Sequence, residues 1–432
     1  MAKSLKTFAR ESAIKKEVAT WTIQDCDDYL NKHKDDNVKP NFLMAKKLNI
    51  VKEHQKILEK IKLAEQMEGK HREEVLKDVP FDLLIKNAPP EAQDPKDKKL
   101  RNYQKHTGVY LWSLGYDVDK FIGAGCSAVV WKCKNGKAMR VACNNKYLGF
   151  IEINNATSEI KDAEEINKII GDDQKKSKHL FTTKHIKVGK DSSKAVFETE
   201  LAKHGDLQKF QGDTSYKKNI ERILQMASDA LKGLKVLHDA GYSHNDIKPD
   251  NILVGEKTKK NGETRAALKI ADFGAMTKIN NTYKIFTNRN FHAPDFYKLN
   301  KKAVAGRDIY SLGCIFIGLL IEDNNFSKNY QKLAKELTSI KSENFFNKYL
   351  KDIYQNIIEP EKDILIEFLD LISKMVQSSY SNRISIDEAI ENIKKLKKGI
   401  KDIKEQKQIK QFKQFKSNVI QELKNNFKNK SK

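Results

Sequence analysis

Two short stretches of the chain carry side chains suited to phosphoryl transfer. YSHNDIKPDNILV contains Asp246, Lys248 and Asn251, and IADFGA places Asp272 directly after an apolar run. Phosphoryl transfer needs a carboxylate that orients the nucleophile, a cation on the transferred group and oxygen ligands for a divalent metal ion. We therefore expect Asp246 to act as the positioning base, Lys248 as the cation, and Asn251 and Asp272 as metal ligands. A turn that merely collects Asp and Asn is the alternative.

A third stretch, FIGAGCSAVV, has the composition of a loop that covers phosphates. Gly123 and Gly125 are followed by Ala128 and Val130 between two strand-like segments. Small residues allow backbone N–H groups to approach a polyphosphate closely. A plain hairpin that is rich in small residues is the alternative reading of this stretch.

The composition indicates anionic partners and a reducing compartment. The formal net charge is +23, which favours a membrane surface, a nucleotide, a nucleic acid or an acidic protein as partner. The five cysteines show no CxxC spacing, so a zinc site is not expected. The N-terminus lacks the apolar core of a signal peptide, and the apolar run at 310–321 is short for a membrane span. We expect a cytoplasmic protein with a buried helix at 310–321.

The elements around these stretches change character along the chain. Residues 116–143 alternate with a period of two and predict three strands, with a hairpin turn at Asn135-Gly136. A helix is expected at 158–170, a strand at 194–202 and a helix at 218–240, and helices predominate to 396. A strand-rich part followed by a helix-rich part predicts an α+β fold with two lobes.

Both flanks of this region are expected to be helical. Residues 1–110 form a helical extension in which Thr22 and Asp25 resemble a capping box, with a proline-containing linker near 87–97. Residues 391–432 hold 14 Lys against 4 acidic residues, with apolar residues at helical spacing. A basic amphipathic tail at 397–432 can dock on an anionic membrane or another polyanion, or it can pack on its own domain.

The pattern resembles the eukaryotic-type protein kinase family. HNDIKPDNILV and ADFGA are similar to that family's HRDLKxxN and DFG motifs. HAPD, which ends at Asp295, resembles APE, and Arg383 resembles the late arginine that pairs with the APE acid. Asp308 in GRDIYSLGCIF resembles the buried aspartate that opens the central helix of the large lobe. The resemblance covers residues 116–396.

The resemblance implies a bilobal fold and a set of site residues. The small lobe would span about 116–202 and the large lobe about 203–396, and the activity would be ATP-dependent, Ser/Thr-directed protein phosphorylation with Mg²⁺, or with Mn²⁺ in its place. FETELAKHGDL resembles the hinge, with Asp206 on the sugar side of the nucleotide. The implied nucleotide-binding residues are Gly123, Gly125, Val130, Arg140, Glu165, Thr199, Glu200 and Ala202.

The chain departs from the family pattern at the phosphate-binding lysine. KAMRVAC places Arg140 there, and arginine is larger and forked. Lys137 and Lys146 are possible replacements. The partner acid is expected to be Glu165, with Glu164 and Glu159 as alternatives. An inactive kinase-like protein that binds nucleotide or serves as a scaffold is therefore the second hypothesis.

A second departure lies before the catalytic aspartate. Asn245 replaces the family's arginine, which usually holds a phosphorylated activation loop, so activity is expected not to need that phosphorylation. Thr287 and Asn288 lie around the position that selects Ser/Thr, which leaves the acceptor preference open.

Three further readings concern class and source. A small-molecule kinase is disfavoured because HAPD and Arg383 are present. Nucleic acid is the least favoured polyanion. The Lys-rich composition and unfamiliar flanks resemble kinases of large viruses, or effector kinases of intracellular pathogens, which would act in a host cytosol or at a membrane surface.

Overall fold

The computed structural model describes most of the chain, in segments separated by short gaps. The described residues are 2–34, 42–93, 100, 104–125, 128–143, 156–171, 173, 178–188, 194–210, 219–258, 262–282, 289–295, 302–321 and 329–430. They form two compact units, one of residues 1–157 with 185–199 and the other of 158–184 with 200–432. The division between Thr199 and Glu200 falls within the stretch that resembles a hinge.

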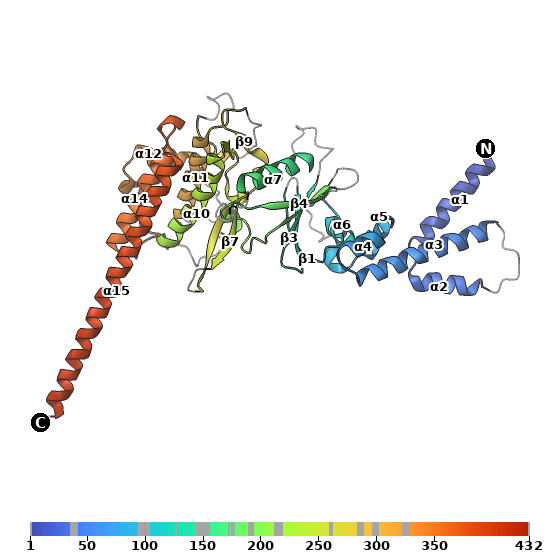
Figure 1. Ribbon diagram of the computed structural model, residues 1–432, viewed down its shortest axis with the longest axis horizontal. Helices are drawn as coiled ribbons and strands as arrows, with labels where there is room; N and C mark the ends of the chain where they lie inside the picture. Colours follow the sequence, from blue (N-terminus) through green and yellow to red (C-terminus); the bar gives the residue numbers. More distant parts are fainter. Residues whose placement is uncertain are drawn as a thin grey trace. The chain divides into compact units, whose positions relative to one another are not determined.

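The first unit begins with helices and ends with a sheet (Figure 1). Its helices are α1 Ala2–Val18, α2 Ile23–Lys32, α3 Phe42–Glu65, α4 Gly69–Leu76, α5 Phe81–Asn87, the 3-10 turn η1 Pro90–Ala92 and α6 Thr107–Ser113. Its strands are β1 Val118–Ala124, β2 Ala128–Cys133, β3 Ala138–Cys143, β4 Thr183–Val188 and β5 Lys194–Thr199, in the order β1-β2-β3-β5-β4. The predicted capping box at Thr22 and Asp25 is confirmed, and so are the strands expected at 116–143.

One face of this sheet shares its core with the N-terminal helices. Alternate strand residues such as Val129, Trp131 and Val141 are buried in one apolar cluster with Leu58 of α3 and Leu111 of α6. Because side chains alternate across a strand, the residues between them face the other way. The N-terminal extension therefore covers one face of the sheet.

The described part of the expected linker is packed, not extended. In residues 87–93, Ala88 and Ala92 are buried in the same cluster. Ala92 lies so close to α6 that a Cβ on Gly108 would meet its carbonyl oxygen at 2.4 Å and the Trp131 ring at 2.7 Å. The prolines thus set a turn whose small residues fit against the sheet, and the role of 87–97 as a linker stays a prediction. The expectation that the extension of residues 1–110 and the region from residue 116 onward are separate domains stays a prediction.

The second unit is mainly helical. Its helices are α7 Ala156–Ile170, α9 Leu207–Phe210, α10 Ile220–Asp239, α11 Ala305–Leu320, α12 Tyr330–Ser339, α13 Ser342–Tyr349, α14 Glu359–Met375 and α15 Ile386–Lys430. Short strands β6 Tyr242–Ser243 and β9 Thr277–Lys278 pair with each other, as do β7 Ile252–Thr258 and β8 Thr264–Ile270. The 3-10 turns are η3 Pro249–Asn251, η4 Phe273–Ala275, η5 Arg289–Phe291 and η6 Tyr380–Asn382.

The core of this unit surrounds α11. Its residues from Arg307 to Leu320 are buried, as expected for the apolar run at 310–321, and α10 and α14 pack against it. In the part of the chain that is described, no helix is both long and apolar enough to cross a membrane. The α10 helix contacts β8 on one side and α15 on another, so it links the strands that precede the site to the C-terminal helix (Figure 1).

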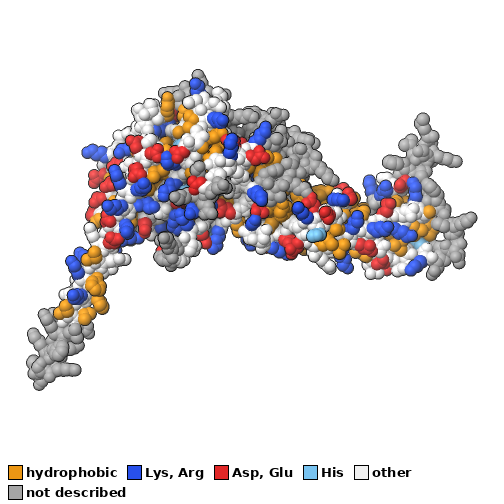
Figure 2. Space-filling view, viewed as in Figure 1, with side chains coloured by type: hydrophobic (Ala, Val, Ile, Leu, Met, Phe, Trp, Pro, Cys, Tyr) orange, Lys and Arg blue, Asp and Glu red, His pale blue; other side chains and the backbone are white. Residues whose placement is uncertain are grey.

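Helix α15 is only partly packed. Ile393, Leu396 and Ile400 are buried in the main core, whereas Ile409 and Phe412 are exposed. The alternative that the tail packs on its own domain is therefore correct for the first turns of α15. Beyond residue 403, the helix presents its apolar side chains to solvent as far as residue 420 (Figure 2).

Candidate active site

The buried Asp308 carboxylate holds the backbone of the loop after β6. Asp308, at the start of α11, accepts hydrogen bonds from the backbone N–H groups of His244 and Asn245, at 2.8 Å each, and from the Ser243 hydroxyl at 2.8 Å. Burial alone would raise the pKa of Asp308, but the hydrogen bond from His238 and these donors lower it overall. The carboxylate therefore stays ionised and fixes the backbone that precedes Asp246.

Asp246 lies at the centre of a short hydrogen-bond network. The Lys248 Nζ is 2.6 Å from the Asp246 Oδ2, and the Asn251 Nδ2 donates to the same oxygen and to the Asp246 carbonyl, at 2.8 Å each. Both amide protons of Asn251 are thus engaged, which leaves its Oδ1 as the atom that can bind a cation. The three predicted catalytic residues are brought together.

The charge on Lys248 is maintained by the surrounding carboxylates. Burial pushes the pKa of Lys248 down, but the negative charges of Asp246 and Asp272 outweigh burial and raise it overall. The lysine is therefore a cation at neutral pH. Since Asp272 acts on Lys248 electrostatically, the two carboxylates and the lysine belong to one charged cluster.

Asp272 is connected to the same loop through its preceding residue. The Ala271 N–H donates to the Asn251 carbonyl at 2.9 Å, and the Ala271 carbonyl lies 3.0 Å from the His244 Nε2. Asp272 itself has φ +60°, in the left-handed region that non-glycine residues rarely adopt. A strained backbone held by two hydrogen bonds next to it indicates that the position of this carboxylate is constrained.

The two predicted metal ligands suit a hard divalent cation. An amide oxygen and a carboxylate are the donor types that Mg²⁺ takes in proteins, and Mn²⁺ accepts the same oxygens. The Asn251 amide and the Asp272 carboxylate therefore fit either of these ions.

Asn245 connects the two loops, a role that the sequence did not indicate. Its φ is +65°, and its Nδ2 donates to the carbonyls of Ser243 and Ala275, at 3.0 Å each. Ala275 follows the DFG-like residues. The only available signal was the asparagine itself, because asparagine tolerates positive φ and bonds to nearby backbone.

The APE-like segment forms the expected ion pair. The Arg383 Nη2 is 3.0 Å from the Asp295 Oδ2, and both side chains are buried. Arg383 also donates to the carbonyls of Gly306, Gln377 and Ser378. The pairing predicted from the resemblance is confirmed.

Glu165 makes a contact that was not predicted. The Tyr242 hydroxyl donates to the Glu165 Oε1 at 2.6 Å, and this hydrogen bond, with a smaller contribution from burial, raises the pKa of Tyr242 to about 12. Helix α7 is thereby tied to the segment that leads into the catalytic loop. The expected role of Glu165 as the partner of Arg140 stays a prediction, as do the alternatives Glu164 and Glu159.

The predicted phosphate-binding residues lie in register across the sheet of the first unit. Gly123 pairs with Val130, Val130 with Arg140, and Arg140 with Phe197. Val130 and Arg140 are direct cross-strand partners, so their side chains share a face, the one opposite the buried Val129 and Val141. The Arg140 guanidinium lies 5.8 Å from the Phe197 ring centre, which restricts its orientation.

The glycine-rich loop is also held by a residue outside the predicted kinase-like region. The buried Gln104 donates through its Nε2 to the Gly125 carbonyl at 2.6 Å, and the Gly125 N–H donates to Ala128 at 2.9 Å. Lone glutamines carry no recognisable signal, so the sequence did not point to Gln104. Lys137, just before β3, forms an ion pair with Glu198 on β5, the strand that neighbours β3 in the sheet.

The residues expected along the nucleotide base lie at and after the end of β5, where the chain passes from the first unit to the second. Thr199 is buried at the end of β5, and Glu200 accepts a hydrogen bond from Lys269. The Ala202 carbonyl accepts from the Gly205 N–H, and Asp206 caps α9 by accepting from the Lys209 N–H at 2.9 Å. Their contacts with a nucleotide stay predictions.

Some predicted positions lie outside the described residues: Lys146, Thr287 and Asn288, together with the side chain of Glu159.

Comparisons with known proteins agree with this geometry. Residues 116–393 match the family profile described as Protein kinase domain. "Mitogen-activated protein kinase 13" of Arabidopsis thaliana is 31% identical over 182 residues, which are 37% of this chain and 47% of that protein. "Extracellular signal-regulated kinase 2" of Dictyostelium discoideum is 26% identical over 311 residues, which are 64% of this chain and 78% of that protein. "Cyclin-dependent kinase 12" of Caenorhabditis elegans is 29% identical over 196 residues, which are 40% of this chain and 26% of that protein. The match spans less than half of the Arabidopsis relative and about a quarter of the Caenorhabditis relative.

Proposed function

The chain belongs to the protein kinase family and has its α+β fold, and from this premise we propose that it transfers the γ-phosphoryl group of ATP to a serine or threonine hydroxyl of a protein. The observation that carries the proposal is the Asp246–Lys248–Asn251 network beside Asp272. The lysine two positions after the aspartate is the Ser/Thr-type pattern.

Each of these side chains has a distinct task. The Asp246 carboxylate accepts the hydrogen bond of the acceptor hydroxyl and orients its oxygen in line with the phosphoryl group. Lys248 balances charge on the transferred group. Asn251 and Asp272 hold Mg²⁺, or Mn²⁺ in its place, and the ion when bound neutralises the phosphate oxygens.

A charge-matched pair of variants tests the proposal. With radiolabelled ATP and a mixed panel of protein and peptide acceptors, Asp246→Asn should lower kcat by about two orders of magnitude or more, because the positioning interaction is made in the transition state. Asp363→Asn, which removes one exposed carboxylate from α14, should act as wild type. Equal rates for wild type and Asp246→Asn would contradict the proposal.

A nucleotide-binding pseudokinase is the second candidate because of Arg140. Arg140→Ala distinguishes the two: an active kinase should lose ATP affinity and phosphate transfer together, since a cation on the phosphates is removed. A pseudokinase would bind ATP without phosphate transfer already in the wild-type chain, and Arg140→Ala would change only its ATP affinity. The assay is nucleotide binding measured beside phosphate transfer on the same preparations.

We also propose that the exposed part of α15 docks on an anionic membrane surface on the cytosolic side. Ile409, Phe412, Phe415 and Val419 are exposed at spacings of three and four, which places them on one side of the helix, and the exposed Ile420 borders that side. Lysines at 407, 410, 413 and 416 lie between them, so apolar insertion and attraction to anionic lipid act together (Figure 2).

Liposome flotation tests the tail. The full chain should float with vesicles that contain phosphatidylserine and should not float with neutral vesicles. Phe412→Ser combined with Phe415→Ser should reduce flotation, whereas Lys332→Gln with Lys335→Gln on α12 should not. Equal flotation of the Phe variant and wild type would remove the tail from the membrane proposal.

A further inference from the structure

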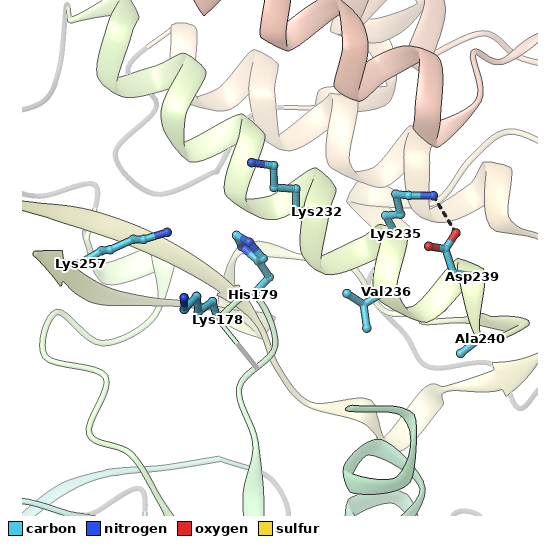
Figure 3. Close-up of a pocket in the computed structure, with 8 residues that line it drawn as sticks. All are labelled: Lys178, His179, Lys232, Lys235, Val236, Asp239, Ala240 and Lys257. Carbon is cyan, nitrogen blue, oxygen red and sulfur yellow. Dashed lines mark hydrogen bonds and ion pairs between the residues drawn. The ribbon is translucent and has the colours of Figure 1, made fainter. Parts of the chain in front are cut away.

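The second unit contains a cavity of 540 Å³ that none of the predicted site residues lines (Figure 3). Four lysines, one histidine and one carboxylate contribute to its wall, from the segment before β4, from α10 and from β7. The family resemblance assigned no role to any of these residues. The lysines that matter for the argument are Lys178, Lys232 and Lys257.

The cavity is built by a close approach of three backbone segments. The Phe181 N–H donates to the Ile270 carbonyl at 2.7 Å, and the Ile270 N–H donates to the His179 carbonyl at 3.0 Å, so this segment continues the β8 edge. Gly233 lets α10 approach it, because a Cβ there would lie 2.6 Å from the His179 carbonyl oxygen. Lys232 is adjacent to this contact, which fixes it beside His179.

One lysine of this cavity and a neighbouring arginine are paired with carboxylates. Lys235 is neutralised by Asp239 at 2.8 Å and by Asp387 at 2.7 Å. The neighbouring Arg265 is paired with Asp229 at 2.6 Å.

The other three lysines have no such partner. Among the described residues, no carboxylate forms an ion pair with Lys178, Lys232 or Lys257. In Figure 3, the Lys235–Asp239 pair lies at one side, and these three lysines surround the His179 ring at the other.

The electrostatics show that these lysines repel one another. Burial lowers the pKa of Lys257, and Arg265, Lys178 and Lys232 lower it further against the opposing effect of Asp229. Burial likewise lowers the pKa of Lys397 on α15, with Lys232 and Arg265 among the causes. The pKa of His179 is lowered to about 4, mainly by burial, so its ring is neutral at pH 7 and offers a hydrogen bond without a further charge. An anion in this cavity would relieve the repulsion.

We propose that the pocket bounded by Lys178, Lys232 and Lys257 binds a compact polyphosphorylated molecule. Its volume is that of a small-ligand site, which favours a small molecule over a macromolecular chain. Ammonium groups on three separate segments can contact several phosphate groups at once, and charged hydrogen bonds to phosphate are strong. Lys397 adds positive potential from α15. The proposal concerns a site that is separate from the residues assigned to ATP.

Isothermal titration of the full chain with myo-inositol hexakisphosphate, at physiological salt, tests the pocket. The expected result is one saturable site whose ligand raises the thermal unfolding temperature, because binding stabilises the folded form. Lys178→Gln, Lys232→Gln and Lys257→Gln together should weaken binding by about tenfold or more, since three charged contacts are lost. The affinity should not change when a non-hydrolysable ATP analogue saturates the nucleotide site.

A charge-matched control separates the pocket from the general basicity of the chain. Lys332→Gln, Lys335→Gln and Lys351→Gln remove the same charge from exposed positions on α12 and after α13 and should leave the affinity within about twofold of wild type. The single change Lys257→Gln, at an exposed position, gives a second measurement if the triple pocket variant unfolds. Equal losses in the pocket and control variants, or no pocket-dependent binding to either the soluble hexakisphosphate or vesicles of phosphatidylinositol 4,5-bisphosphate, would overturn the proposal.

Two arms distinguish the possible sources of the phosphates. A soluble inositol phosphate that binds in a pocket-dependent manner indicates a free metabolite. Binding that depends on the pocket lysines only with vesicles of phosphatidylinositol 4,5-bisphosphate indicates a lipid headgroup, and here the Phe412→Ser/Phe415→Ser background keeps the tail from contributing. Competition by a polyglutamate peptide at equal charge concentration, with no preference for phosphate, would instead indicate an acidic protein and refute the small-ligand proposal.

Discussion

Asn245 replaces an arginine whose usual partner is a phosphate group, and it makes a contact that needs none. Its amide joins the catalytic loop to the Ala275 carbonyl. In the proposed kinase, this hydrogen bond holds the segment after Asp272 in place, an effect that a phosphorylated activation loop would otherwise provide. Activity should therefore be independent of phosphorylation in that loop.

This expectation has two measurable parts. Treatment with a broad phosphatase should leave the kinase rate unchanged, as checked by mass spectrometry of the loop. Asn245→Ala should lower kcat by about tenfold, since a buried hydrogen bond is worth about 1 kcal/mol and the remaining group is left unpaired. Loss of activity on dephosphorylation of that loop alone would show that the loop is held in another way.

At the scale of single residues, the sequence predicted the catalytic side chains better than the hydrogen bonds that join distant segments. Asp246, Lys248 and Asn251 carry a recognisable spacing, and so does the pair of Arg383 with Asp295. Gln104 and Tyr242 could not be found in this way. Each acts through one side-chain hydrogen bond to a distant segment, and such contacts leave no local pattern.

The contact of α6 with β2 leaves no space for an added side-chain atom. Gly108 leaves no room for a Cβ against Trp131 and the Ala92 carbonyl, and the Trp131 Nε1 donates to the Thr107 hydroxyl at 2.9 Å. Gly108→Ala should destabilise this unit by about 1–3 kcal/mol, because a backbone carbonyl cannot move aside cheaply.

Urea unfolding followed by tryptophan fluorescence measures this change. Trp21, Trp112 and Trp131 all lie in the first unit, so the signal reports on it alone. Gly123→Ala is the matched control, since a Cβ there meets nothing within 4 Å. An unchanged midpoint for Gly108→Ala would show that α6 can shift without cost.

Helix α15 should tolerate truncation at one point and not at another. Among the side chains that the structure describes, a chain that ends after residue 406 loses only exposed ones, and it should keep the melting temperature of the second unit. A chain that ends after residue 392 loses Ile393, Leu396 and Ile400, each worth about 1.5–3 kcal/mol when buried, and should unfold that unit. Circular dichroism melts of the two truncated chains compare these outcomes.

At the scale of elements, periodicity predicted helices and strands but could not predict how those elements pack against one another. The strands over 116–143 and the α10 helix lie where the pattern placed them. The proline-rich stretch looked like a linker because its composition is that of one, but Ala88 and Ala92 are small enough to enter a core. Burial of small residues depends on neighbours that a single sequence does not identify.

At the scale of the whole molecule, the helices before residue 116 and the sheet after it share one core. Cys133 on β2 lies in that core, and burial raises the pKa of its thiol to about 12. Since thiolates are the reactive form, Cys133 should resist alkylation at pH 8 in the folded protein. The raised pKa also makes the stability of the folded protein depend on pH. A thiol whose pKa is raised from 9 contributes stability that is complete below pH 9 and is lost as the pH rises through about 12.

Alkylation with iodoacetamide, read at each cysteine by mass spectrometry, measures this protection. Cys133 should become reactive at the same urea concentration at which the tryptophan fluorescence changes. Labelling of Cys133 at lower urea would mean that the N-terminal helices detach before the sheet unfolds. Cys314, buried in the core of the second unit, reports on that unit separately.

The shared core has a practical consequence for anyone who isolates the catalytic region. A protein that starts at residue 116, where the family profile begins, lacks the partners of Val129, Trp131 and Val141 and the glutamine that fastens the glycine-rich loop. Such a fragment would expose an apolar face of the sheet and would aggregate into inclusion bodies during expression. A soluble, crystallisable fragment has to start upstream of α3.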